Sequence, residues 1–374
     1  MPAHPGDVPP PGADDEAVTP RGVTLGVTFL ATVLLVSGLA VVPSPYVVKS
    51  PGPTRDTLGQ VDDEDLITIE GAETYESTGE LLLTTVGVGG GPGYPVNLVQ
   101  VLQGWADGTR AVFPVEEVFP ADTTQEELDA SSAADMTSSQ ENATYAALHE
   151  LGYEIPVEVT VLQAVEGSGA EGHVEEGDVI TTVAGTPIEE YEDLTTALDG
   201  TEAGAPVTLG VLRDGVPVEL SFPSSPDPQG GDGARLGVFV SPAFDFPVDV
   251  SIRIDDIGGP SAGTMFALGI IDRLTEVDEA NGEIIAGTGT IDTSGTVGPI
   301  GGIQQKLHGA LRDGAAWFLA PADNCSEVYG HVPDGLTVVR VETLSDALAA
   351  TTAIGSGDTA DLPTCTADDV AASR

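Results

Sequence analysis

The alternation of apolar and polar positions predicts both strands and helices along this chain. Residues 66–70 and 80–88 are rich in apolar and β-branched side chains, which is typical of strands. Residues 123–151 carry apolar side chains at helical spacing, and Ser138 to Glu141 offers a helix-capping sequence within that stretch. We therefore expect a mixed α+β fold.

A long apolar run near the start predicts a further element. Residues 22–42 contain no charged side chain, and a helix of about 20 such residues can cross a bilayer. Residues 1–21 have the composition of a disordered tail and lack the basic start of a cleaved signal peptide. The pattern predicts a single-pass transmembrane helix in the cell membrane, with the lipid bilayer as a partner, followed by a linker over residues 43–59.

Residues 153–228 form a small unit of their own. A strand-like stretch and a glycine-rich loop come first, and a short helical stretch at residues 191–198 follows. The unit closes with a hairpin whose turn is Asp214-Gly215. Through Gly177-Asp178-Val179-Ile180 and Gly185-Thr186-Pro187-Ile188, it resembles PDZ domains of the bacterial protease-associated type. The resemblance implies binding of extended peptide ends, and a spacer that binds nothing is the alternative.

Ser261 is the first candidate for chemistry. It lies in the sequence Gly-Gly-Pro-Ser-Ala-Gly at residues 258–263, which precedes a run with helical spacing, so the pattern predicts a helix whose first turn holds Ser261. Unpaired backbone N–H groups at the start of a helix can hold a developing oxyanion, and the helix dipole favours the same charge. The simpler alternative is that Ser261 only caps the helix.

Lys306 is the second candidate. The pattern of residues 303–311 places Lys306 on the apolar face of a predicted helix that ends before Gly314. A lysine directed into a core is costly unless its amine is neutral or paired, and a neutral amine can serve as a general base. The alternative is a lysine whose amine reaches water while its stem packs on the core.

Composition narrows the classes of function. The chain has 12 basic and 60 acidic residues, a formal charge of −48, which argues against nucleic-acid binding. Only two residues, Lys49 and Lys306, are lysines, and no Gly-Lys-Ser/Thr sequence occurs, so a P-loop is excluded. The histidines lack zinc-ligand spacing, and we expect no metal and no cofactor. Cys325 and Cys365 could form one disulfide or remain free thiols.

Together these segments resemble the proteolytic domain of Lon proteases. The resemblance rests on Gly-Gly-Pro-Ser-Ala-Gly followed by Thr-Gly-Thr-Ile-Asp-Thr-Ser-Gly-Thr-Val-Gly-Pro-Ile-Gly-Gly-Ile-Gln-Gln-Lys, which ends at Lys306. It implies that Ser261 is the nucleophile, Lys306 the general base and Thr288 the residue that orients the lysine. Gly259, Pro260 and Ala262 complete the motif around the serine.

The resemblance also implies an organisation for the whole chain. With the apolar run and the Tyr-Val-Val-Lys-Ser-Pro-Gly-Pro stretch, it looks like the membrane-anchored Lon-like proteases with a PDZ domain of Gram-positive bacteria. The protease domain would be split into residues 60–152 and 229–352 by the PDZ-like unit, with an acidic tail at 353–374. Protein or peptide substrates, an extracytoplasmic catalytic part and a homo-oligomeric ring, with a hexamer expected, are implied as well.

One departure and two rival functions stay open. Gly258 stands where Lon proteins often carry an acidic residue, and Asp255 and Asp256 are candidates to replace it. Gly-Pro-Ser-Ala-Gly also fits the nucleophile elbow of α/β-hydrolases, in which Asp313 and His331 would complete a triad by their order. The other rival is a catalytically inert, tethered scaffold that binds peptides.

Overall fold

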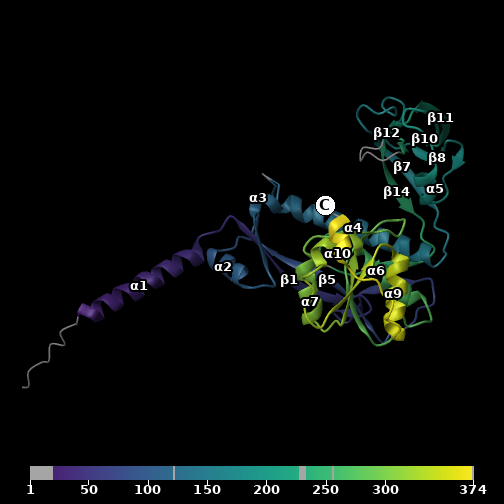
Figure 1. Cartoon of the computed structure of the whole chain (residues 1–374). Helices are drawn as coiled ribbons and strands as arrows, with labels where there is room; N and C mark the ends of the chain where they lie inside the picture. Colours follow the sequence, from purple (N-terminus) through teal and green to yellow (C-terminus); the bar gives the residue numbers. More distant parts are fainter. Residues whose placement is uncertain (1–19, 121–122, 227–232, 255–256, 373–374) are drawn as a thin grey trace, which may run out of the picture. The chain divides into compact units, whose positions relative to one another are not determined.

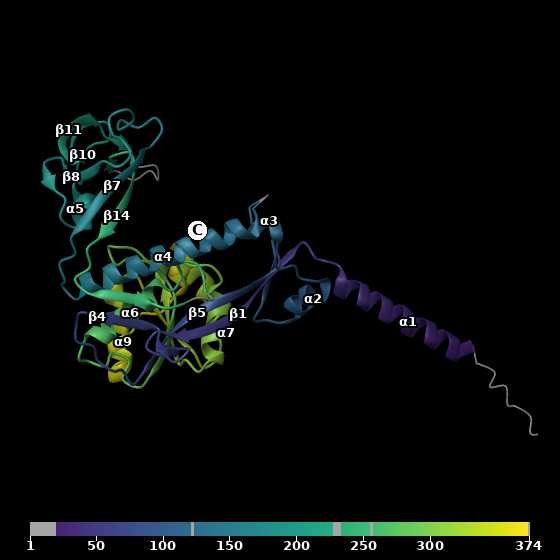
Figure 2. The same cartoon turned by 180° about the vertical axis from the view of Figure 1, so that it is seen from behind.

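The computed structural model describes residues 20–120, 123–226, 233–254 and 257–372. The described residues form two compact units, one lying within residues 1–48 and 89–121, and one lying within residues 49–88 and 122–374. Figures 1 and 2 label their helices and strands from two opposite sides. The fold contains both helices and strands, as the pattern predicts, and is of the mixed α/β kind; the units are described separately below.

The smaller unit is mainly helical. Its elements are α1 (Pro20–Val41), α2 (Leu98–Ala106), β6 (Ala111–Pro114) and α3 (Val115–Val118). Helix α2 begins where the Asn97 side chain accepts from the Gln100 N–H and the Gln100 side chain accepts from the Asn97 N–H. This reciprocal capping satisfies two backbone donors that the helix itself leaves free.

The predicted transmembrane helix over residues 22–42 was wrong. The apolar run does fold as helix α1, but threonines and glycines interrupt its apolar side chains, and the Thr28 and Thr32 hydroxyls turn back to carbonyls four residues earlier. Within the described ranges, no helix has both the length and the apolar character needed to cross a membrane. The expected single-pass localisation in the cell membrane, with contact to the lipid bilayer through this helix, was wrong for the same reason.

The larger unit is built on a sheet whose strands run in the order β20-β19-β16-β5-β1. Strand β16 pairs in parallel with β5 on one side and with β19 on the other, and β19 pairs in parallel with β20. The strand predicted at residues 80–88 is β5. The bounds are β1 (Tyr46–Asp56), β5 (Glu80–Gly89), β16 (Ile284–Gly287), β19 (Trp317–Pro321) and β20 (Thr337–Val341).

Helices cover both faces of this sheet. Leu81 and Leu83 belong to the hydrophobic cluster that includes α4, α6 and α9, whereas Leu82 between them belongs to the cluster of α7. Successive side chains of a strand point to opposite faces, so the sheet separates these two clusters. The helices are α4 (Gln125–Glu150), α6 (Gly263–Leu274), α7 (Ile303–Arg312) and α9 (Leu344–Ser356).

Short strands and turns complete this part of the unit. The strand predicted at residues 66–70 is β4, which pairs antiparallel with β15. The short elements are β2 (Gln60–Val61), β3 (Glu64–Asp65), β4 (Ile67–Glu70), β15 (Asp249–Ile252), β17 (Thr290–Ile291), β18 (Val297–Gly298), η1 (Ala322–Asn324), α8 (Cys325–Val328) and α10 (Ala367–Ala372).

Helix α4 confirms the helix predicted over residues 123–151 but not the cap predicted inside it. The helix begins after Thr124, whose side chain accepts from the Glu127 N–H while the Glu127 carboxylate accepts from the Thr124 N–H. The helix therefore continues through the interior sequence from Ser138 to Glu141. The Ser139 side chain is free to make a different contact.

A second sheet contains the PDZ-like region, with strands in the order β11-β10-β8-β7-β14. The predicted hairpin is confirmed, because β10 pairs with β11 across Asp214-Gly215 and both turn residues have positive φ. Strand β14 pairs with β7 and extends the sheet past residue 228. The elements are β7 (Val157–Ala164), β8 (Val179–Val183), β9 (Thr186–Pro187), α5 (Tyr191–Thr196), β10 (Pro206–Arg213), β11 (Val216–Pro223), β12 (Ser225–Pro226), β13 (Ala234–Arg235) and β14 (Val238–Phe244).

The C-terminal segment is tied to the larger unit. Cys325 and Cys365 form a disulfide. This excludes the alternative of two free thiols, which the sequence left open. The Arg340 N–H also donates to the Pro363 carbonyl, which fixes the segment beside β20.

Candidate active site

Ser261 lies just before helix α6. The helix begins at Gly263 with Ala262 as its cap residue, so Ser261 is neither within the first turn nor the capping residue. Its side chain is instead engaged by Lys306, whose Nζ lies 2.7 Å from Ser261 Oγ. The partner of the hydroxyl is therefore an amine 45 residues further along the chain.

Lys306 points from helix α7 into the core, as the apolar pattern predicts. The residue is 2% exposed, and its neighbours Ile303, Leu307 and Ala310 are fully buried. Burial lowers the pKa of Lys306 from its ordinary value to about 7, because the low-dielectric interior penalises the ammonium form. In the part of the chain that the structure describes, no carboxylate forms an ion pair with this lysine.

Thr288 is the third residue of the cluster, and it is fully buried at the end of β16. Its Oγ1 lies 2.8 Å from Lys306 Nζ and 2.9 Å from the Ser261 carbonyl oxygen, to which it donates. The N–H of Gly289 donates to the same carbonyl. The strand end thus holds both the lysine side chain and the serine backbone.

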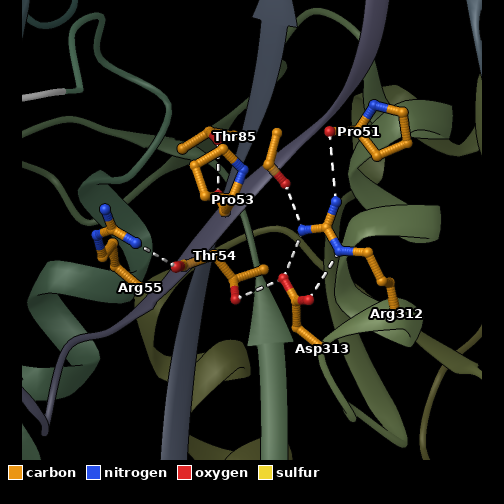
Figure 3. Close-up of polar contacts among 8 residues, drawn as sticks. Pro51, Pro53, Thr54, Arg55, Thr85, Arg312 and Asp313 are labelled. Carbon is orange, nitrogen blue, oxygen red and sulfur yellow. Dashed lines mark hydrogen bonds and ion pairs between the residues drawn. The ribbon is translucent and has the colours of Figure 1, made fainter.

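The end of helix α7 is fixed against strand β1. The Arg312 guanidinium donates to the carbonyl oxygens of Pro51 and Gly52 and to the Asp313 carboxylate, which also accepts from the Thr54 hydroxyl (Figure 3). These contacts anchor the helix about two turns after Lys306. The Ser-Pro-Gly-Pro stretch predicted as part of a linker is therefore a strand that supports this helix.

The start of helix α7 is fixed by Asn324. Its side-chain oxygen accepts from the Ile300 N–H, and its side-chain nitrogen donates to the Ile300 carbonyl. Gly302 precedes the helix in a left-handed conformation with φ of 73°, which glycine adopts without strain. Both ends of the helix that carries Lys306 are thus held by hydrogen bonds.

Helix α4 holds the loop before Ser261. The Gly259 N–H donates to the Ser132 carbonyl, and the Ser139 hydroxyl donates to the Pro260 carbonyl at 3.1 Å. Ser139 was not predicted as a site residue, because in the sequence it is one of several serines of the same helical stretch. Of the motif residues, Ala262 is buried and Gly259 has a φ of +87°. Asp255 and Asp256 lie outside the described residues.

The alternative triad does not assemble around Ser261. Asp313 is bound to Arg312 and Thr54 (Figure 3). His331 is exposed after α8. In the described ranges neither residue forms a hydrogen bond to Ser261. The same ranges contain no group of three His, Cys, Asp or Glu residues arranged to hold a metal ion.

The cluster can carry out a proton transfer. A neutral amine has one lone pair and two N–H groups, so Lys306 can donate to Thr288 and still accept the proton of the Ser261 hydroxyl. The pKa of about 7 makes this neutral form accessible near neutral pH.

Comparison with known families identifies two domains. Residues 254–353 match the Lon protease (S16) C-terminal proteolytic domain, and residues 133–223 match a PDZ domain. The first match contains Ser261, Thr288 and Lys306. The second begins within helix α4 and ends at the last residue of β11.

Curated relatives are named Lon protease. The protein from Azospirillum brasilense is 40% identical over 93 residues, 24% of this chain and 11% of that protein. The protein from Geobacter metallireducens is 30% identical over 189 residues, 48% of this chain and 22% of that protein. Lon protease 2 of Bacillus subtilis is 33% identical over 107 residues, 27% of this chain and 19% of that protein. The matched regions thus span from 11% to 22% of the length of these relatives.

Proposed function

We propose that this chain is a serine endopeptidase in which Ser261 and Lys306 form a catalytic dyad. The observation that carries the proposal is the 2.7 Å contact between Ser261 Oγ and the Nζ of a buried lysine. The Lon-type proteolytic domain around this contact supports a peptidase of the serine type.

The first half of the reaction forms an acyl-enzyme. Ser261 Oγ attacks the scissile carbonyl carbon, and the hydroxyl proton passes to Lys306 Nζ. Backbone N–H groups beside Ser261 stabilise the oxyanion of the tetrahedral intermediate. The C–N bond then breaks, and the Lys306 ammonium returns its proton to the leaving amine.

The second half regenerates the enzyme. A water molecule attacks the acyl carbon while Lys306 takes one of its protons, and the bond to Ser261 Oγ breaks. The proton returns from Lys306 to Ser261 Oγ, and the carboxylic product leaves. Thr288 accepts a hydrogen bond from Lys306 Nζ. This contact directs the lone pair of the neutral amine at Ser261.

The PDZ domain supplies a second function within the same proposal. It binds extended segments of protein substrates by adding a strand to the edge strand β14, which carries Phe239 with its side chain half exposed. We expect Phe239→Asp to raise KM for an unfolded protein and to leave the rate of phosphonate labelling at Ser261 unchanged.

The homo-oligomeric ring implied by the resemblance remains a prediction that size measurements in solution can test.

A labelling experiment tests the dyad. The whole chain is treated with a fluorophosphonate, which reacts with an activated serine, and hydrolysis of labelled casein is followed in parallel. Wild type and Lys49→Met, in which the other lysine is replaced, should be labelled and active, whereas Ser261→Ala and Lys306→Met should be neither. Labelling that persists in Lys306→Met but is lost in His331→Ala would overturn the dyad in favour of the triad. A folded wild type that neither reacts nor hydrolyses casein would support the inert scaffold.

A further inference from the structure

We propose that Ser139 of helix α4 is a positioning residue for the peptidase reaction, because it orients the peptide bond that carries the Ser261 N–H. This inference rests on the proposed function of Ser261. It concerns a residue outside the stretch that matches the proteolytic domain, and it starts from one hydrogen bond between segments 121 residues apart.

The contact of Ser139 differs from those of similar residues on the same helix. Thr137 and Thr144 donate to the carbonyls of Ala133 and Gln140, four residues earlier, which is the usual arrangement for a hydroxyl inside a helix. Ser139 instead donates across to the Pro260 carbonyl, and it is only 2% exposed. The Ser139 hydroxyl therefore links helix α4 to the loop before Ser261, whereas the two threonine hydroxyls bond only within the helix.

A second bond joins the same helix to the same loop. The carbonyl of Ser132, seven residues and about two turns before Ser139, accepts from the Gly259 N–H at 3.0 Å. Helix α4 therefore holds a donor and an acceptor of consecutive residues in the loop. Gly259 sits between them at a φ of +87°, a conformation that costs a residue with a side chain more than it costs glycine.

Helix α4 is a rigid support for these bonds. Its N-terminus is capped by Thr124, and Ala143, Ala146 and Ala147 are buried in the cluster shared with α6. The helix behind the loop is therefore fixed by contacts that do not involve the loop itself. Movement of the loop would have to break the bonds from Ser132 and Ser139.

Through the peptide bond between Pro260 and Ser261, the Ser139 contact sets the direction of the Ser261 N–H. The bond between Pro260 and Ser261 is trans, so its C=O and its N–H point in opposite directions. Because Ser139 draws the Pro260 carbonyl toward α4, the Ser261 N–H is directed away from α4. That N–H is one of the backbone donors available to an oxyanion formed on a carbonyl attacked by Ser261 Oγ.

The test compares Ser139→Ala with Ser138→Ala, an exposed neighbour on the same helix. In Ser139→Ala we expect the second-order rate of fluorophosphonate labelling and kcat for casein to fall about tenfold, as for the loss of one hydrogen bond. KM should stay within about twofold, and the pH midpoint set by Lys306 should not move, because Ser139 does not touch the lysine. Ser138→Ala should match the wild type.

A third variant separates hydrogen bonding from packing. Ser139→Cys fills nearly the same space but carries a weaker hydrogen-bond donor. Its labelling rate and kcat should therefore be no lower than those of Ser139→Ala and clearly below those of the wild type. Wild-type rates in both Ser139 variants, with Ser261→Ala inactive, would overturn the positioning role and leave the proposed function intact. Wild-type rates in Ser139→Cys alone would also overturn it, because packing would then explain the alanine variant. A wild type without labelling would instead contradict the proposed function itself.

Discussion

The Thr288 hydroxyl donates a hydrogen bond of 2.9 Å to the backbone carbonyl of Ser261. A hydroxyl has a single hydrogen, so its contact with Lys306 at 2.8 Å must be one in which the lysine donates. This fixes the direction of the polar network. One N–H of Lys306 points to Thr288, and the lone pair of its neutral form is left for the Ser261 hydroxyl.

Replacement of Thr288 by valine tests this network. Thr288→Val keeps the shape of the side chain and removes both hydrogen bonds, so we expect kcat for casein to fall about tenfold or more. Thr288→Ser keeps the hydroxyl and should retain most of the activity. Equal kcat values for the valine and serine variants would show that the hydroxyl does not orient Lys306.

The pH dependence expected for the proposed reaction follows from Lys306. Burial lowers the pKa of Lys306 to about 7, and only the neutral amine can accept the Ser261 proton. We therefore expect kcat/KM to rise about tenfold per pH unit below pH 7 and to level off above it. Initial rates on labelled casein from pH 5.5 to 9.5, with Ser261→Ala as the blank, measure this profile. A profile that still rises steeply at pH 9 would contradict a neutral Lys306 near pH 7.

The sequence predicts the local placement of Ser261 and Lys306 well, because each lies in a local pattern. The apolar spacing around Lys306 correctly predicts its burial, and the glycine and proline before Ser261 indicate a turn leading into a helix. A run of residues with one period constrains which face a side chain occupies. Such patterns are readable without knowledge of distant contacts.

The support of the site could not be predicted in the same way. Ser139 looks like a polar residue of a capping sequence, and its bond to Pro260 depends on how helix α4 packs against α6. The apolar run at residues 22–42 correctly predicts a helix, but the prediction that this helix crosses a membrane was wrong. The role of the Ser-Pro-Gly-Pro stretch depends on Arg312, which lies more than 250 residues later.

The same lysine affects stability. Its lowered pKa means that between about pH 7 and 10 the unfolded chain binds more protons than the folded chain, so the free energy of unfolding rises with pH. Lys306→Met lacks this dependence. We expect the difference in unfolding free energy between wild type and Lys306→Met to change by about 1.4 kcal/mol per pH unit from pH 7.5 to 9.5, in favour of the wild type as pH rises. Urea unfolding at several pH values measures it, and a constant difference would contradict the lowered pKa.

The disulfide between Cys325 and Cys365 closes a loop with a sequence separation of 40 residues. Chain entropy predicts that such a link stabilises the folded state by about 4 kcal/mol, because it restricts the unfolded chain. We expect Cys365→Ala to lower the free energy of unfolding by about 2 to 4 kcal/mol in urea at pH 8. A reductant should lower the stability of the wild type to a similar extent and should leave Cys365→Ala unchanged. Unfolding curves for wild type and variant that coincide without reductant would show that the link does not stabilise this chain.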